Sequence, residues 1–173
     1  QVNLFITGVG NVGKKLLAQL LQQHEYLKQH LRLNIKLVGL ASSTKMLINE
    51  DGISLNTWQQ DLENAGSMDI NSFVHTISSK NLRNSIFADV TASNTVAECY
   101  QELFKKSISV VACNKIACSS SYNVYKELKN KAREYNSLFL FETNVGAGLP
   151  IISTLNDLLR SGDAINKMQA VLS

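Results

Sequence analysis

Phe5-Ile-Thr-Gly-Val-Gly-Asn-Val-Gly13 joins a short apolar run, residues 2–6, to the G-x-G-x-x-G pattern of Gly8, Gly10 and Gly13. The apolar residues that follow recur at the spacing of one helical face, and they are Val12, Leu16, Leu17, Leu20 and Leu21. A strand, a tight glycine turn and a helix form the context that a dinucleotide-binding fingerprint requires. In that fingerprint Gly8 makes the sharp turn, Gly10 lets the backbone approach a pyrophosphate, and Gly13 lets the helix pack closely. A glycine-rich turn that binds nothing is the alternative, and the flanking strand and helix favour the phosphate site.

Apolar strand-like runs alternate with amphipathic helical segments along the rest of the chain. We expect further strands at residues 33–40, 86–90, 107–112, 138–141 and 168–172. We expect helices after the capping residue Asp69, after a capping box of Thr95 and Glu98, over residues 122–135, and from Pro150 to Gly162. This alternation predicts an α/β fold with a doubly wound parallel sheet of the Rossmann type.

One segment departs from this regular alternation, and the last predicted helix ends at Gly162, where we expect the domain to end. Residues 45–68 are polar and are predicted to form an irregular crossing, with a short helix over residues 55–62. The last helix carries an apolar stripe that we expect to be buried, made of Ile151, Ile152, Leu155, Leu158 and Leu159. The predicted organisation is a dinucleotide-binding domain over residues 1–162, with residues 163–173 starting a truncated second domain for substrate binding or dimerisation.

Composition and charge narrow the class of protein. The 173 residues are 45% hydrophobic and 18% charged, which is typical of a globular core. No apolar run approaches about 18 residues and no signal peptide is recognisable, so we expect a cytoplasmic protein that does not enter a membrane. A net charge of +3 without a basic block argues against nucleic-acid binding. Because the chain opens on Gln1 rather than Met, we expect it to be cut from a longer protein.

The three cysteines, Cys99, Cys113 and Cys118, match no metal-binding spacing. They predict reduced, partly buried thiols.

The second strand of such a domain normally ends in an acidic residue that binds the ribose 2′-hydroxyl of NAD. Here no acidic residue lies between Glu25 and Glu50, and the position is filled by Ser42, Ser43, Thr44 and Lys45. Hydroxyl groups and a cation suit a 2′-phosphate, so Ser42 and Lys45 are candidate cofactor residues and NADP is favoured over NAD. An ordinary polar loop with one exposed lysine remains the alternative.

Polar residues also follow the later strands, at the edge where ligands bind in such sheets. Thr91 and Ser93 are expected to contact the nicotinamide half of the cofactor, although a hydroxyl there also serves as a helix cap. Lys115 follows an apolar strand and is the candidate for contact with a cofactor phosphate or a substrate oxygen. Carbonyl groups in the loop 142–149 suit a hard monovalent cation, with Glu142 as the charged ligand, although a tight strand-to-helix turn explains this loop equally well.

Four motifs together resemble the nucleotide-binding part of homoserine dehydrogenase. They are GVGNVG at 8–13, DVTAS at 89–93, VACNKIA at 111–117 and FETNVGAGLP at 141–150. The segment 45–68 is similar to that of the bifunctional aspartokinase–homoserine dehydrogenase type. The resemblance implies reversible reduction of L-aspartate 4-semialdehyde to L-homoserine with NAD(P)H, on the way to threonine and methionine, by a homo-oligomeric parent enzyme.

The resemblance also assigns roles to residues of this chain. The pyrophosphate would be held by Gly8, Val9, Gly10, Asn11, Val12 and Gly13, with Thr91 and Ser93 beside the nicotinamide and Lys115 at the cofactor or substrate. A sodium ion would be bound by Glu142, Val145, Ala147 and Leu149, three of them through main-chain oxygens. The family's substrate carboxylates and its proton-transferring lysine follow a Ser-Gly-Thr segment that would begin at Ser173. The chain alone is therefore expected to lack most of the substrate pocket and to be inactive.

Two other functions stay open at this point. Another semialdehyde or amino-acid dehydrogenase would act through a thioester on Cys113 or Cys118, although neither has a convincing histidine base. A non-catalytic nucleotide-sensing module would bind the cofactor and change its oligomeric state.

Overall fold

Seven strands form one sheet in the computed structural model, which describes residues 1–170. The sheet order is β4-β3-β2-β1-β5-β6-β7. Five strands are parallel: β1 (Val2–Thr7), β2 (Ile35–Ala41), β5 (Ser85–Asp89), β6 (Ser109–Ala112) and β7 (Phe139–Leu140). The other two, β3 (Lys45–Ile48) and β4 (Gly66–Ser67), run antiparallel at one edge.

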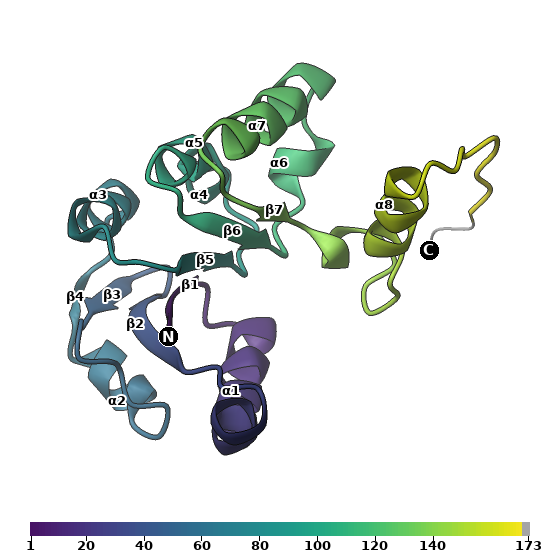
Figure 1. Ribbon diagram of the computed structural model, residues 1–173. Coiled ribbons are helices and arrows are strands. Elements are labelled where there is room, and N and C mark those ends of the chain that lie inside the picture. Colours follow the sequence, from purple (N-terminus) through teal and green to yellow (C-terminus); the bar gives the residue numbers. More distant parts are fainter. Residues whose placement is uncertain (171–173) are drawn as a thin grey trace.

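Helices cover both faces of the sheet (Figure 1). The covering helices are α1 (Asn11–His30), α2 (Trp58–Glu63), α3 (Ile70–Lys80), α4 (Asn94–Glu98), α5 (Tyr100–Phe104), α6 (Ile116–Ser119) and α7 (Tyr122–Glu134). A 3₁₀ turn η1 at Glu142–Asn144 and the helix α8 (Ile152–Arg160) follow β7. Alternate residues of β1 separate the two apolar layers, because Phe5 packs with α3 to α7 while Leu4 and Ile6 pack with α1 and α2. The predicted doubly wound α/β fold is confirmed. Among the residues described, no helix is both long and apolar enough to cross a membrane.

The segment predicted to be an irregular crossing instead extends the sheet. Ser42 to Lys45 form a hairpin turn between β2 and β3, in which the Ser42 N–H donates to the Lys45 carbonyl at 2.8 Å. The Ser42 hydroxyl oxygen also accepts from the N–H groups of Thr44 and Lys45, at 3.2 and 2.9 Å. Polar turn residues followed by the apolar run Met46 to Ile48 are the sequence signature of a hairpin. The predicted parallel sheet is therefore extended at this edge by two antiparallel strands that the sequence analysis did not predict.

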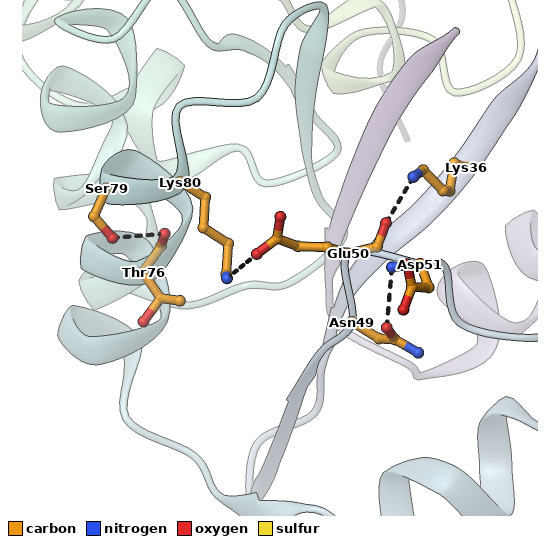
Figure 2. Close-up of polar contacts among 7 residues, drawn as sticks. All are labelled: Lys36, Asn49, Glu50, Asp51, Thr76, Ser79 and Lys80. Carbon is orange, nitrogen blue, oxygen red and sulfur yellow. Dashed lines mark hydrogen bonds and ion pairs between the residues drawn. The ribbon is translucent and has the colours of Figure 1, made fainter.

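The turn after β3 is fixed to both the sheet and a helix (Figure 2). Lys36 on β2 donates to the Glu50 carbonyl at 2.6 Å, and Lys80 in the last turn of α3 forms an ion pair with the Glu50 carboxylate. The Asp51 N–H donates to the Asn49 side chain at 3.0 Å. These contacts hold the antiparallel edge against the rest of the domain.

The N-termini of two helices test the predicted caps. Asp69 caps α3 as predicted, because its carboxylate accepts from the Asn71 N–H at 3.0 Å. The capping box of Thr95 and Glu98 is wrong, since α4 already begins at Asn94 after the extended residue Ser93. Thr95 therefore lies in the first turn, with its hydroxyl 2.9 Å from the Ser93 hydroxyl.

Two predicted apolar faces are less buried than expected. On α1, Val12 is 59% exposed and Leu21 is 42% exposed, whereas Leu17 is buried. The buried stripe is centred on Gly13, Leu17 and Leu20, and at 100° per residue Val12 and Leu21 fall on its two margins.

The helix α8 stands away from the sheet (Figure 1), which explains why its apolar stripe is not buried. Leu158 and Leu159 are 42% and 51% exposed. The helix begins at Ile152 rather than at Pro150, and Gly162 with φ +95° follows its end as predicted. The strand expected over residues 168–172 is not present at 168–170, and residues 171 and 172 lie outside the described part of the chain.

Candidate functional site

A cleft of about 680 Å³ opens at the carboxyl ends of β1, β2 and β5. We call it the glycine-turn cleft, and its lining residues are Thr7, Gly8, Val9, Gly10, Ser42, Ser43, Met68, Ile70, Thr91, Ser93, Thr95 and Val96. The sheet order changes direction at β1, because the chain continues to β2 on one side and to β5 on the other. Ligands of open α/β sheets bind at such a switch point.

The three glycines differ in what a side chain would meet. Gly8 has φ +96°, and a Cβ there would lie 2.6 Å from the Val90 carbonyl oxygen. A Cβ on Gly13 would lie only 2.0 Å from the Gly8 carbonyl oxygen, so this glycine permits the close approach of α1 to the turn. A Cβ on Gly10 would meet no described atom within 4 Å. Gly10 therefore faces open space in the cleft, as a residue that contacts a ligand through its backbone would.

The first turn of α1 provides a site for an anion. The helix begins at Asn11 after Gly10, which has no side-chain cap, and its first turn contains no acidic residue. Asn11 and Val12 are exposed. The free N–H groups and the positive end of the helix dipole therefore lie directly after Gly10, which lines the cleft, and a phosphate group would be stabilised there.

At the end of β2 the structure separates the two predicted cofactor residues. Ser42 and Ser43 line the glycine-turn cleft. Lys45 does not line it, because it is the first residue of β3 and its ammonium donates to the Ala65 carbonyl at 2.9 Å. The residues that line this cleft include no Asp or Glu.

At the end of β5, Thr91 is held by a residue that the sequence analysis did not single out. Asp89 is fully buried, and its Oδ1 accepts from the N–H and the hydroxyl of Thr91 at 2.8 and 2.7 Å. Its Oδ2 accepts from the Tyr100 hydroxyl at 2.5 Å and from the Asn114 amide at 2.9 Å. These four residues form what we call the Asp89 cluster. Because the Thr91 hydroxyl donates its proton to Asp89, it is not free to donate to a ligand.

Asn114 links the Asp89 cluster to two neighbouring loops. Its amide nitrogen also donates to the Ser93 carbonyl at 2.9 Å, and its main-chain carbonyl accepts from the Asn144 amide at 3.2 Å. Burial raises the pKa of Tyr100, with the nearby Asp89 as the second cause, so its phenol remains a donor. An acidic residue inside the apolar run Ile86 to Val90 is costly to bury without partners. An acidic residue within an apolar strand was therefore the sequence signal for Asp89, and the sequence analysis did not use it.

Lys115 follows Asn114 at the start of α6, at the carboxyl end of β6, as predicted. Its side chain is exposed and does not line the glycine-turn cleft. Among the described residues it makes no ion pair. The structure therefore places Lys115 on the expected sheet edge, next to the Asp89 cluster rather than inside the cleft.

The loop 142–149 leads from β7 to α8, and its acidic residue caps that helix. The two carboxylate oxygens of Glu142 accept from the N–H groups of Ile152 and Ser153, at 2.9 and 2.7 Å. Ala147 has a positive φ of +50°. The main-chain carbonyls of Val145 and Ala147 accept no backbone hydrogen bond within the described chain, whereas that of Glu142 accepts from Val145 and that of Leu149 from Ile151. No cluster of three or more His, Cys, Asp or Glu side chains suited to a metal occurs in residues 1–170.

Cys118 does not have the surroundings of a nucleophile. Cys113 and Cys118 are partly buried and unbridged. Burial raises the pKa of the Cys118 thiol, and a hydrogen bond with Asn144 opposes this only in part. A thiol with a raised pKa is a poor nucleophile near neutral pH.

The sheet order, the glycine turn and the cleft at the switch point together define a dinucleotide-binding α/β domain. The comparisons with known proteins give the particular family. Residues 8–142 match the model of the family described as homoserine dehydrogenase, NAD binding domain. The chain belongs to this family, which confirms the resemblance read from the four motifs.

Three relatives show how far the similarity extends. The bifunctional aspartokinase/homoserine dehydrogenase of Haemophilus influenzae is 38% identical over 99% of this chain, which covers 21% of that relative. Homoserine dehydrogenase of Schizosaccharomyces pombe is 33% identical over 99% of the chain, which covers 46% of the relative. A hyperthermophilic archaeal homoserine dehydrogenase mutant in complex with NADPH superimposes with a TM-score of 0.73 at 25% identity, over 92% of this chain and 49% of that one. The chain thus spans about a fifth to a half of the length of these relatives.

Proposed function

We propose that this chain is the cofactor-binding part of a homoserine dehydrogenase that uses NADP for the reversible reduction of L-aspartate 4-semialdehyde to L-homoserine. The observation that carries this proposal is the glycine-turn cleft at the switch point of the sheet, where no atom fills the space beside Gly10. The pyrophosphate would lie on the turn Gly8 to Gly13, against the first turn of α1. The similarity to an enzyme solved with NADPH supports the same site.

The preference for NADP is proposed from the end of β2. The 2′-phosphate would be bound by the hydroxyl and N–H groups of Ser42 and Ser43, which line the cleft. Lys45 would contribute its charge only after leaving the Ala65 carbonyl. NAD would find no carboxylate there to accept from its ribose 2′-hydroxyl.

When bound, the reduced cofactor would supply a hydride to the aldehyde carbon. This chain would orient the nicotinamide half at the end of β5, through the loop of Thr91 and Ser93. Lys115 would meet the substrate oxygen or a cofactor phosphate from the end of β6, where a cation stabilises developing negative charge. Most of the substrate pocket would come from a further domain that begins in the segment 163–173, after a dinucleotide-binding domain of residues 1–162, and the parent enzyme would be a cytoplasmic homo-oligomer.

A sodium ion is proposed for the loop 142–149, with Glu142, Val145, Ala147 and Leu149 as ligands. The carbonyls of Val145 and Ala147 are available, and oxygen donors suit a hard cation. The Glu142 carboxylate would have to share its oxygens with the N-terminus of α8. Such an ion would add rigidity to the turn between β7 and α8.

The test is a fluorescence titration with NADPH and NADH, together with a semialdehyde reduction assay. NADPH binding by the chain with little or no turnover, and turnover by the full-length protein, is the expected result. Robust turnover by residues 1–173 alone would contradict the proposed division of the site. NADPH binding that changes the oligomeric state of an inactive full-length protein would instead favour a nucleotide sensor.

A further inference from the structure

Asp89 places a buried carboxylate directly behind the wall of the glycine-turn cleft. The residue is 0% exposed, and its two oxygens accept four hydrogen bonds. All four donors, which belong to Thr91, Tyr100 and Asn114, are neutral groups. No Lys, Arg or His within residues 1–170 forms an ion pair with Asp89. The carboxylate is thus fully hydrogen-bonded, and its hydrogen-bond donors are all neutral.

The position of this carboxylate relative to the cofactor follows from the topology. A dinucleotide on the turn after β1 places its adenosine ribose at the end of β2. Its nicotinamide half then lies on the opposite side of β1, at the end of β5, where Thr91 and Ser93 line the cleft. Because the Thr91 hydroxyl lies 2.7 Å from Asp89 Oδ1, the carboxylate is one hydrogen bond behind that part of the wall.

The two redox forms of the cofactor differ in charge at this end. The oxidised nicotinamide ring is a cation, whereas the dihydronicotinamide ring is neutral. A fixed negative charge nearby therefore stabilises one form and not the other, and a low-dielectric setting strengthens the effect.

We propose that Asp89 is a positioning residue that holds the Thr91 loop and that its charge makes the glycine-turn cleft favour the oxidised over the reduced cofactor. This inference rests on the proposed function, since it requires a nicotinamide cofactor in the cleft. The positioning role alone would affect both redox forms equally, so the discrimination between them is the distinct consequence of the charge.

The test compares the Kd values of NADP⁺ and NADPH for wild type and Asp89→Asn, with the protein expressed at its full natural length. NADPH is titrated by its fluorescence, and NADP⁺ by displacement of NADPH. The ratio of the Kd of NADP⁺ to that of NADPH should rise about three- to tenfold in the variant, which is the size expected for one charge behind the wall of a solvent-open cleft. A variant that weakens both forms equally, with an unchanged ratio, overturns the inference.

Tyr100→Phe is the matched control. It removes the hydrogen bond from the Tyr100 hydroxyl to Asp89 Oδ2 and keeps the charge of Asp89. It should therefore lower thermal stability and leave the ratio of Kd values unchanged. If Asp89→Asn does not fold, Asp89→Ser replaces it, because the smaller side chain leaves room for water to bond with the stranded donors. Wild-type protein that binds neither redox form contradicts the proposed function itself, and that outcome is distinct from an unchanged ratio.

Discussion

Replacing two glycines of the same turn by alanine should affect different properties: thermal stability at Gly13 and cofactor affinity at Gly10. At Gly13, the added Cβ would lie 2.0 Å from the Gly8 carbonyl oxygen, so α1 or the turn must move. Overpacking of this kind costs about 1–3 kcal/mol or more, and each kcal/mol shifts Tm by about 2–4 °C in a domain of this size. Gly13→Ala should therefore lower the Tm by about 2–12 °C.

At Gly10, the added Cβ would meet nothing within 4 Å, and φ is −71°, which alanine adopts without strain. The free energy of unfolding of Gly10→Ala should stay within about 1 kcal/mol of wild type. Its Cβ would, however, enter the space that the pyrophosphate needs, so the Kd of NADPH should rise at least about tenfold, equivalent to about 1.4 kcal/mol.

Thermal melting and NADPH fluorescence titration of the two variants separate these effects. Gly66→Ala on the edge strand β4 is the control, because a Cβ there also meets nothing within 4 Å and Gly66 does not line the glycine-turn cleft. It should change neither quantity appreciably. Wild-type NADPH affinity in Gly10→Ala would refute the assignment of the pyrophosphate to this turn, and a Tm loss equal to that of Gly13→Ala would refute the packing argument.

Four further tests address other parts of the chain. Ser43→Asp should weaken NADPH relative to NADH about tenfold, because a carboxylate at the end of β2 repels the 2′-phosphate; Lys45→Met should change the Kd of NADPH less than about threefold if its ammonium stays on Ala65, and a larger loss would show that it moves to the phosphate. Glu142→Gln should destabilise the first turn of α8 by about 0.5–2 kcal/mol, seen as faster amide exchange there than in α3, and unchanged exchange would contradict its role as a cap. Cys118 should react slowly with iodoacetamide at pH 7 and faster as the pH approaches its raised pKa, because only the thiolate attacks; mass spectrometry measures the rate, and rapid labelling at pH 7 would contradict the effect of burial.

Local chemistry allowed the sequence to predict most of the parallel strands and the glycine turn. Gly13 must lack a side chain because of the Gly8 carbonyl in the same turn, and Gly8 itself has a positive φ. Both requirements are local, so they are visible in a short motif. The sequence predicts Lys45 as a cofactor residue because its actual partner, the Ala65 carbonyl, is twenty residues away along the chain. Nothing in the sequence around Lys45 indicates that contact. Asp89 was missed for a related reason, since its partners at Tyr100 and Asn114 become neighbours only when α5 and β6 pack against β5.

The apolar stripe of α8 shows a different limit. A helical pattern predicts which side of a helix is apolar, but it does not state what covers that side. For α1 the cover is the sheet, and Leu17 is buried. For α8 the sheet is not the cover, and Leu158 and Leu159 remain exposed in the part of the chain described.

Both carboxylate oxygens of Glu142 bind the first turn of α8, and this turn is the pivot about which the helix would tilt. The helix has 9 residues and is therefore about 13 Å long. A tilt of about 10° at the pivot would displace its far end by roughly 2 Å, by the same geometry. Displacements of about 1 Å are enough to misplace a reacting group. A change in the helix angle set at Glu142 would therefore move any partner that touches the far end of this helix.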